Sequence, residues 1–560
     1  MRTATWCAAV LWLTGCGEGA GGPSEASDAG VDSAIGSSEP DAATASADAM
    51  SGAGDASPQQ AVSDASTSAR DGALAVPVPR PQDDGTLGWK TCLDKYQCGS
   101  LRVPLDYSDP MSATLKVALM RRLATGTRVG ALLINPGGPG SSAVDYLDFF
   151  AQAAAKSPLL ERFDLIAFDP RGVGYSTPLD CHSTLQKLVA ADPTPDSEAE
   201  WTALDDASAA FAAECASKSP ELLPFVGTVN VARDMEQVRA ALGEDKLDYL
   251  GFSYGGSIGA WYAELFPTHV GRFVLDGAVD LALSALDLQL GQAKGFELAL
   301  SHYFSWCNEE PSRCTWTQGA PPAEAFATVL AAVEATPIPA PKSDRKLGPG
   351  EFLLAVSATM YGGQAGWVAL SPALRDARAG DASGLMTFVD NYLERAADSS
   401  YANLTEMNYA VSCVDQASPT VAEVRAQAAR FASEAPNFGV RALTGELVCS
   451  HWPVPGKDVP APTGRGAPPI VVIGTLNDPA TPYAWAQAFA KALVSSVLLS
   501  SNGEGHTGYG RGDTCIDDAV NAFLIDGVVP QTGCATALTK GRNGQHTSAG
   551  AGSLWLPHRH

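Results

Sequence analysis

Residues 249–259 read YLGFSYGGSIG, a short apolar run that leads into a serine with glycine on both sides. Glycine costs conformational entropy, and it is used where a backbone turn or a close approach leaves no room for a Cβ atom. An apolar strand followed by Gly-x-Ser-x-Gly and then by a helix forms a sharp turn that lifts the serine hydroxyl above the end of a sheet. The stretch therefore predicts a strand, a tight turn and a helix.

The Gly-x-Ser-x-Gly pattern fits this stretch twice, at residues 251–255 and at residues 255–259. The expected strand, residues 246–250, leads directly into the first match only. Ser253 should therefore lie at the turn, and Ser257 should lie one helical turn further along. We predict Ser253 as the nucleophile. The pattern is weak by itself in a chain with 55 glycines, so partners for this serine must come from elsewhere in the sequence.

Apolar runs that end in turn residues recur along the chain, at residues 131–140, 163–172, 246–256, 271–280, 469–478 and 496–506. Buried parallel strands have this continuous apolar character, and amphipathic stretches such as residues 231–242 supply the crossover helices. We predict an α/β fold with a mostly parallel sheet flanked by helices. Because the strand rhythm stops between residues 281 and 466, we expect a helical cap inserted between two core parts, residues 85–280 and 467–560.

A serine hydroxyl is a poor nucleophile and needs a general base, which an acid orients. On a strand–turn–helix of this kind the order along the chain is serine, acid, histidine. Of the eight histidines, four follow residue 473, and three of these lie in the polar terminal tail. His506, after the last apolar run, is the predicted base, and Asp478, after the run before it, is the predicted acid. Asp276, one run earlier, is the alternative acid.

Residues 135–142, NPGGPGSS, follow an earlier apolar run and offer backbone amides in a turn that a substrate can approach closely. Donors fixed in advance stabilise the negative charge that develops on a substrate carbonyl oxygen by about 3 kcal/mol each. We predict an oxyanion hole made of the amides of Gly138 and Tyr254. A simple glycine-rich turn is the alternative.

The chain begins MRTATWCAAVLWLTGCGEG, with one basic residue, a short apolar run and then Leu-Thr-Gly-Cys, which predicts an export signal at residues 1–16. It resembles a bacterial lipoprotein signal, in which Cys16 would be lipidated; an ordinary cleaved signal is the alternative. Residues 17–84 hold 12 acidic residues and 2 arginines, a net charge of −10, and predict a disordered acidic tether. Because no later stretch has 18 unbroken apolar residues, we expect an anchored or secreted protein.

The formal net charge of the whole chain is −25, which argues against a nucleic acid partner. Ten cysteines follow Cys16, and an even number in an exported chain favours disulfides. Pairing of neighbours along the sequence is the simplest arrangement: Cys92 with Cys98, Cys181 with Cys215, Cys307 with Cys314, Cys413 with Cys449, and Cys515 with Cys534. Metal binding is the weaker alternative because no typical ligand spacing appears, and we expect no metal and no cofactor.

Several segments together closely resemble secreted α/β-hydrolases of the tripeptidyl aminopeptidase and prolyl aminopeptidase group, over roughly residues 90 to 540. They are CGSLRVPLDYSDP, LLINPGGPGSSA, FDLIAFDPRGVGYSTPL, LGFSYGGSIGAWYAELFPTHVGRFVLDGAVD, GFELALSHYFSWC and GTLNDPATPYAWAQAFA. The resemblance implies an α/β-hydrolase fold and hydrolysis of peptides from a free N-terminus through an acyl-enzyme on Ser253, with Asp478 and His506. It also implies that residues 470–540 are the TAP-like segment of the tripeptidyl branch. One departure, NPGGPG in place of HGGPG, leaves prolyl specificity open.

An exopeptidase must also hold the α-ammonium group of its substrate, which calls for a carboxylate at a fixed distance from the serine. Glu297 in the expected cap is the first candidate and Asp415 the second; exposed helix carboxylates are the alternative for both. Trp306, Trp367 and Trp452 are candidates for lining the pocket or for packing in a core. Two other functions stay open: an esterase of the same fold, and a tethered binding protein with an inactive hydrolase body.

Overall fold

The computed structural model describes residues 86–181, 183–531 and 534. The predicted signal at 1–16, with Cys16, and the predicted tether at 17–84 lie outside the described residues. Within the described part of the chain, no helix has the length and apolar character needed to cross a membrane.

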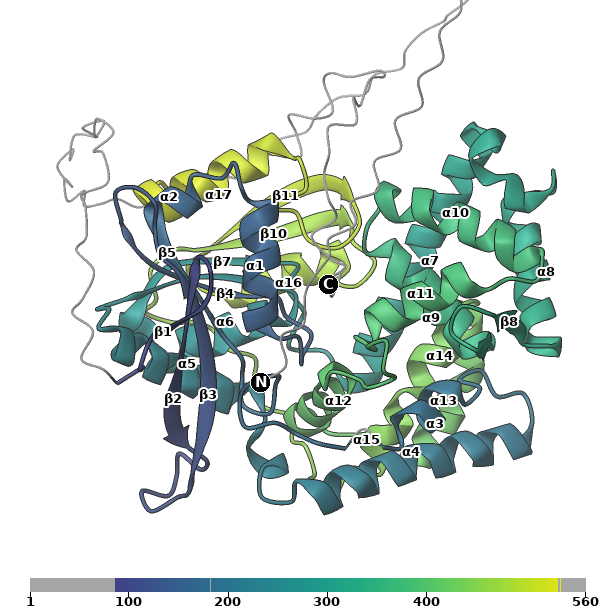
Figure 1. Cartoon of the computed structure of the whole chain (residues 1–560), viewed down its shortest axis with the longest axis horizontal. Helices are drawn as coiled ribbons and strands as arrows, with labels where there is room; N and C mark the ends of the chain where they lie inside the picture. Colours follow the sequence, from purple (N-terminus) through teal and green to yellow (C-terminus); the bar gives the residue numbers. More distant parts are fainter. Residues whose placement is uncertain (1–85, 182, 532–533, 535–560) are drawn as a thin grey trace, which may run out of the picture. The chain divides into compact units, whose positions relative to one another are not determined.

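One sheet organises the described residues (Figure 1). Its strands are β1 (Lys90–Leu93), β2 (Tyr96–Pro104), β3 (Thr114–Arg122), β4 (Gly130–Asn135), β5 (Phe163–Phe168), β6 (Leu247–Phe252), β7 (Val270–Asp276), β10 (Ile470–Asn477) and β11 (Ser496–Glu504). They are ordered β1-β2-β3-β5-β4-β6-β7-β10-β11 in space. The pairings from β5 to β11 are all parallel, and only those at the β1-β2-β3 end are antiparallel. This mostly parallel sheet confirms the predicted fold class.

Helices cover both faces of the sheet. Side chains that alternate along a strand point to opposite faces, so strands that are apolar throughout need cover on both. In β4, Leu132 and Ile134 are buried with helices on one face, whereas Leu133 is buried in the cluster on the other face. The first face packs against α1 (Ala143–Ala153) and α17 (Thr514–Asp526), with α2 (Leu159–Arg162) at one end. The second face packs against α5 (Thr228–Leu242), α6 (Tyr254–Leu265) and α16 (Tyr483–Ala492). Burial on both faces explains the continuous apolar runs in the sequence.

The cap, as we call residues 281–466, consists mostly of helices that follow β7 in the chain. They are α7 (Ala285–Glu309), α8 (Pro322–Ala335), α9 (Pro349–Met360), α10 (Gln364–Arg378), α11 (Ser383–Tyr392), α12 (Leu404–Asp415), α13 (Val421–Glu434), α14 (Gly439–Thr444) and α15 (Glu446–Ser450). A small antiparallel pair, β8 (Ile338–Ala340) with β9 (Arg345–Leu347), interrupts them.

Two helices that precede β6, α3 (Leu185–Ala190) and α4 (Glu198–Lys218), pack against the cap although the sequence placed them in the first core part. Leu204 of α4 is buried with Leu290 of α7 and with residues of α13 to α15. Figure 1 shows α4 running beside α13 and α15. The exact division into core and cap therefore stays an interpretation.

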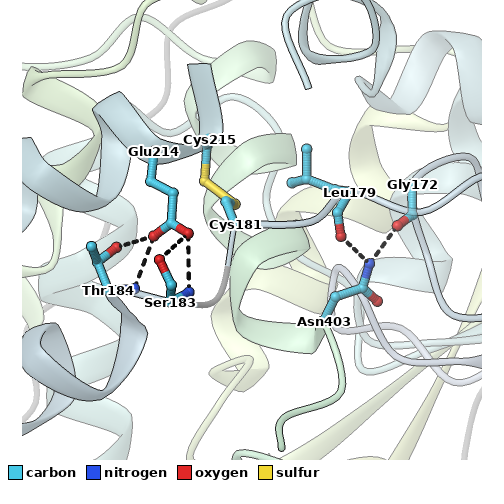
Figure 2. Close-up of a disulfide and its surroundings, with 8 residues drawn as sticks. All are labelled: Gly172, Leu179, Cys181, Ser183, Thr184, Glu214, Cys215 and Asn403. Carbon is cyan, nitrogen blue, oxygen red and sulfur yellow. Dashed lines mark hydrogen bonds between the residues drawn. A yellow bond between two sulfur atoms is a disulfide. The ribbon is translucent and has the colours of Figure 1, made fainter. Parts of the chain in front are cut away.

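All five disulfides predicted from neighbouring cysteines are present. Figure 2 shows one of them, Cys181–Cys215, which joins the segment before α3 to α4. Beside it, the Glu214 carboxylate accepts hydrogen bonds from the amides and hydroxyls of Ser183 and Thr184. The disulfide and this carboxylate together fix α3 against α4.

The start of α12 is attached to the loop that follows β5. The side-chain amide of Asn403, the residue before α12, donates to the carbonyl oxygens of Gly172 at 2.6 Å and Leu179 at 2.9 Å (Figure 2). Since Asp415 at the end of α12 lines the same cavity as Ser253, this amide helps to set where the cap meets the sheet.

Candidate active site

Ser253 lies at the turn between β6 and α6, where the sequence predicted it. Its φ is +54°, a conformation that costs a non-glycine residue about 1–3 kcal/mol and that clusters at functional sites. The flanking glycines are required by space, because a Cβ on Gly251 would lie 2.6 Å from the carbonyl oxygen of Gly255. Ser257 lies inside α6. The second match to the Gly-x-Ser-x-Gly pattern therefore lies within the helix and does not form the turn.

His506 and Asp478 follow β11 and β10, two neighbouring strands of the sheet. His506 Nδ1 donates to Asp478 Oδ2 at 2.8 Å, and both side chains are fully buried. When a carboxylate accepts from Nδ1 of an imidazole, Nε2 is the nitrogen that acts as the proton acceptor, which is the arrangement that activates a serine.

Other donors converge on the same carboxylate. Asp478 accepts from the amides of Ala480 at 2.9 Å, Thr481 at 2.8 Å and Thr507 at 3.1 Å, and from the Thr481 hydroxyl at 3.0 Å. The Thr481 hydroxyl also lies 3.2 Å from His506 Nδ1. The orientation of the carboxylate toward His506 is thus fixed by backbone and side-chain groups on two loops.

The alternative acid, Asp276, has a different set of contacts. This residue ends β7, is fully buried, and accepts from the backbone amides of Gly508 at 2.9 Å and Tyr509 at 2.8 Å. Burial raises the pKa of Asp276 to about 7, against the lowering effect of these two amides. Its carboxylate anchors the loop after His506, whereas Asp478 is the residue bonded to His506 Nδ1.

Ser253 and His506 each lie close to the end of β7, Ser253 at Asp276 and His506 at Gly277. The Ser253 amide donates to the carbonyl oxygen of Asp276 at 2.7 Å, and a Cβ on Gly277 would lie 3.0 Å from His506 Cε1. Because β6, β7, β10 and β11 are successive in the sheet, their carboxyl ends form one edge. The structure therefore brings Ser253, Asp478 and His506 together at that edge.

The glycine turn after β4 packs directly against Ser253. Gly137 and Gly138 both have positive φ, +100° and +108°. A Cβ on Gly137 would lie 2.5 Å from the carbonyl oxygen of Phe252 and 3.1 Å from the Tyr254 nitrogen. Gly138 and Tyr254 line the same cavity as Ser253, which is the placement that an oxyanion hole requires.

Two family models and several known proteins match large parts of this chain. The family model described as alpha/beta hydrolase fold matches residues 130–318, and the one described as TAP-like protein matches residues 435–536. Serine protease Hip1 of Mycobacterium tuberculosis is 37% identical over 456 residues, 78% of this chain and 86% of the relative. The chain belongs to the α/β-hydrolase family.

Two further relatives carry different activities in their names. Carboxylesterase B of Mycobacterium tuberculosis is 36% identical over 478 residues, 82% of this chain and 90% of the relative. A tripeptidyl aminopeptidase of Streptomyces lividans is 32% identical over 466 residues, 79% of this chain and 84% of the relative. This α/β-hydrolase is a serine hydrolase, and the predicted resemblance to the tripeptidyl aminopeptidase group is confirmed.

The main cavity of this α/β-hydrolase, about 530 Å³, lies between the sheet edge and the cap, with Ser253 in its wall. Asp415, at the end of α12, lines it and accepts hydrogen bonds from the amide and the hydroxyl of Thr228. The Thr228 hydroxyl also lies 2.6 Å from the Tyr254 hydroxyl. Burial raises the pKa of Asp415 to about 6, while Thr228 acts in the opposite direction.

Glu297, the first candidate for binding the substrate amine, does not line the main cavity of the hydrolase. Its carboxylate accepts hydrogen bonds from the amide and side chain of Asn437 and from the amide of Phe438. The structure thus places this carboxylate at the start of α14, which it holds on α7, and not in the wall of the main cavity. The candidate tryptophans are also not in the cavity wall but in the cores of the chain: Trp306, Trp367 and Trp452.

Two charged residues that the cap brings to the site were missed by the sequence analysis. Glu446 lines the main cavity and a second one beside it, and Arg441 lines the second. Their positions depend on the packing of α14 and α15, for which no local pattern exists. Among the described residues, no group of histidine, cysteine and carboxylate side chains could hold a metal ion.

Proposed function

We propose that the protein is an exported serine exopeptidase that releases N-terminal residues or tripeptides from peptides. The observation that carries the proposal is that Ser253 and the half-buried carboxylate of Asp415 line one cavity, with the bonded His506–Asp478 pair at the same edge of the sheet. A hydrolase that accepts any acyl group has no use for a negative charge at this point of the cavity wall, whereas an α-ammonium group needs one.

In the proposed mechanism, Ser253 Oγ attacks the scissile carbonyl carbon while His506 takes the hydroxyl proton. Asp478 keeps the imidazole oriented and stabilises its protonated form. The amides of Gly138 and Tyr254 donate to the oxyanion of the tetrahedral intermediate. His506 then gives its proton to the leaving amine, and a water molecule, activated by the same histidine, hydrolyses the acyl-enzyme.

In the same proposal, Asp415 is the counter-ion of the substrate α-ammonium group, with Thr228 holding its carboxylate in place. The Thr228 hydroxyl connects this carboxylate to the side chain of Tyr254, whose amide is the predicted oxyanion donor. A chain of hydrogen bonds thus fixes the distance between the amine site and the oxyanion hole. A fixed distance is what an enzyme needs if it cleaves at a constant number of residues from the N-terminus of its substrate.

Hydrolysis of chromogenic amides tests the proposal, using one amino acid and a tripeptide, each with a free and an acetylated N-terminus. Wild type should cleave the free-amine amides, and Ser253→Ala should lower the rate by at least about 10³-fold. Asp415→Asn should raise KM for free-amine substrates by about 10- to 100-fold and leave acetylated esters unaffected. Glu446→Gln is the matched control on the same cavity. A loss in that variant instead would assign the amine to Glu446.

An esterase is the second candidate, favoured by the similarity to carboxylesterase B. Turnover of p-nitrophenyl esters by wild type, with no cleavage of any amide, would establish it in place of the exopeptidase. A protein that turns over neither class, although it is folded, would support the tethered binding protein.

We also propose export with a lipid on Cys16. The disulfides of the described residues support it, since such bonds persist in oxidising compartments. The test is fractionation of cells that express wild type and Cys16→Ala, with a labelled fatty acid. Label and membrane association that disappear in the variant are expected. Equal release of both proteins in soluble form would overturn the anchor.

A further inference from the structure

A second cavity, of about 280 Å³, adjoins the main one inside the cap. The two share wall residues, among them Tyr361, Asn408 and Glu446. Tyr361 connects this cavity to the chemistry, because its ring meets the imidazole of His506 edge-on at 5.3 Å and its carbonyl oxygen accepts from the His506 amide at 3.0 Å. The second cavity therefore begins beside the candidate base and extends away from Ser253.

Arg441 of α14 lines this second cavity. No side-chain hydrogen bond, ion pair or cation–π contact joins its guanidinium to any residue that the structure describes. Three tyrosines of the same wall, Tyr361, Tyr392 and Tyr409, lie around it. The nearby carboxylate of Glu446 accepts from the Gln289 side chain at 2.7 Å and forms no ion pair with Arg441. Arg441 is thus a half-buried cation in the wall of this cavity, without a counter-ion among the described residues.

Arg171, at the sheet, shows how this chain treats an arginine that only supports the fold. Its fully buried guanidinium donates to both oxygens of Asp234, at 2.7 and 2.6 Å, and to the carbonyl oxygens of Pro104, Leu105 and Phe225. A charge removed from water is costly unless such partners replace it. Arg441 lacks them, which indicates that its partner arrives from outside.

The position of Arg441 is fixed by the backbone of α14. Glu297 of α7 accepts from the amides of Asn437 and Phe438 at the start of this helix, and the Thr444 hydroxyl at its end donates to the carbonyl oxygen of Pro193 at 2.7 Å. The guanidinium is therefore presented from a helix held at both ends, and it does not sit on a loop that could turn outward.

We propose that the second cavity is a subsite for an acidic side chain in the released, acyl part of the substrate, with Arg441 as the counter-ion of its carboxylate. The proposal rests on the proposed function, in which that part is bonded to Ser253 in the adjoining cavity. A planar guanidinium matches a carboxylate with two parallel hydrogen bonds, and tyrosine hydroxyls supply further donors. The expected substrates are peptides with Asp or Glu within the segment that is released.

The test compares tripeptide amides that carry Glu or Gln at each position in turn, since this pair differs in charge and hardly in size. Wild type should prefer Glu over Gln in kcat/KM by at least about tenfold at one position. Arg441→Gln should bring that ratio to about 1 and leave all-alanine substrates within about twofold, and Arg441→Lys should keep part of it. Arg375→Gln, an exposed arginine of α10, is the matched control and should change nothing.

A wild-type ratio near 1 at every position, or a ratio that Arg441→Gln leaves intact, would overturn the subsite while the exopeptidase stands.

If no amide is cleaved, the p-nitrophenyl monoester of glutaric acid and its uncharged glutaramate analogue replace the peptides. A preference for the charged ester that depends on Arg441 then supports the subsite although the exopeptidase has failed. If no ester is cleaved either, titration calorimetry measures whether wild type and Arg441→Gln bind glutarate. Binding by wild type that Arg441→Gln abolishes supports the subsite, and no binding refutes it.

Discussion

The carboxyl edge of the sheet and the cap treat buried polar groups in opposite ways. At the edge, Asp478 and Asp276 accept several hydrogen bonds each, mostly from backbone amides that the strand ends hold in place. In the cap, the half-buried guanidinium of Arg441 has no counter-ion among the described residues, and neither oxygen of the fully buried Glu406 accepts from another described residue.

This difference separates polar groups whose charge and direction are fixed from polar groups whose state changes when a ligand or a proton arrives. A carboxylate surrounded by donors keeps its charge and its direction, which a reaction at a defined point requires. A buried group without partners changes state when a ligand or a proton arrives, because either one removes the cost of its isolation. We therefore expect substitutions at the edge to act on catalysis and substitutions in the cap to act on specificity, stability and pH dependence.

Substitution of the two buried aspartates at the edge, one at a time, tests the largest expected effect. Asp478→Asn should lower kcat by about 10⁴-fold, because the imidazole loses the acceptor that sets its tautomer. Asp276→Asn keeps an acceptor for the amides of the loop after His506 and should lower kcat by less than about 10²-fold. Steady-state rates on one good substrate measure both. The reverse order would make Asp276 the acid.

Removal of one disulfide from each region extends the comparison to stability. Cys413–Cys449 closes a loop of 36 residues between α12 and α15, and Cys92–Cys98 closes one of 6 residues at the sheet. Loop-closure entropy predicts losses of about 4 and about 2 kcal/mol in the free energy of unfolding when both cysteines of a pair become serine. Denaturant unfolding tests this. Equal losses would mean that chain entropy does not set the difference.

Two glycines with similar φ distinguish a crowded turn at the edge from an open one in the cap. Gly137→Ala would place a Cβ 2.5 Å from a backbone oxygen beside Ser253, and it should lower kcat/KM by about 10²- to 10³-fold as the Gly138 amide moves. Gly380→Ala, where φ is +93° and no atom lies within 4 Å, is the control. It should cost about 1 kcal/mol of stability and no activity. Equal activities of both variants would remove Gly138 from the oxyanion hole.

The smallest expected effect comes from Glu406 in α12. Burial raises its pKa to about 7, and Asp180, Glu214 and Glu394 act in the same direction. Its native pKa thus exceeds that of the unfolded chain, so its protonated form stabilises the fold at low pH and this contribution is lost as pH rises toward and past 7.

Glu406→Gln should therefore be more stable than wild type by only about 1 kcal/mol at pH 5, where the unfolded glutamate is already mostly ionised. At pH 8 the variant should be more stable, by at most about 3 kcal/mol. The other buried carboxylates titrate in both proteins and cancel in the difference. A difference that does not grow between pH 5 and pH 8 would contradict a protonated Glu406.

The sheet could be predicted from sequence because its information is local. Each strand is a continuous apolar run, and Ser253, Asp478 and His506 each follow such a run, so the parallel order alone gathers them at one edge. The disulfides could be predicted for a related reason, since their partners are neighbours along the chain. The catalytic roles themselves remain a proposal.

The cap could not be predicted in the same way because its contacts join distant residues. Glu297 has the appearance of a free helix carboxylate until α14 packs on α7, and its partner Asn437 is 140 residues away. Leu204, which the sequence assigned to the core, meets the cap through α4. Arg441 and Glu446 carry no motif, because an unpaired charge is a property of the folded surroundings and not of the residues next to it in the sequence.

From Cys92 onward, each cysteine is joined to its nearest cysteine neighbour along the chain, so no cross-link encloses or crosses another. A chain that emerges amino end first presents both thiols of one pair before the first thiol of the next pair appears. An oxidant that joins thiols in order of emergence produces the native set directly, with no exchange between wrong partners. The order of the cysteines along the chain therefore coincides with the order in which the native pairs can form.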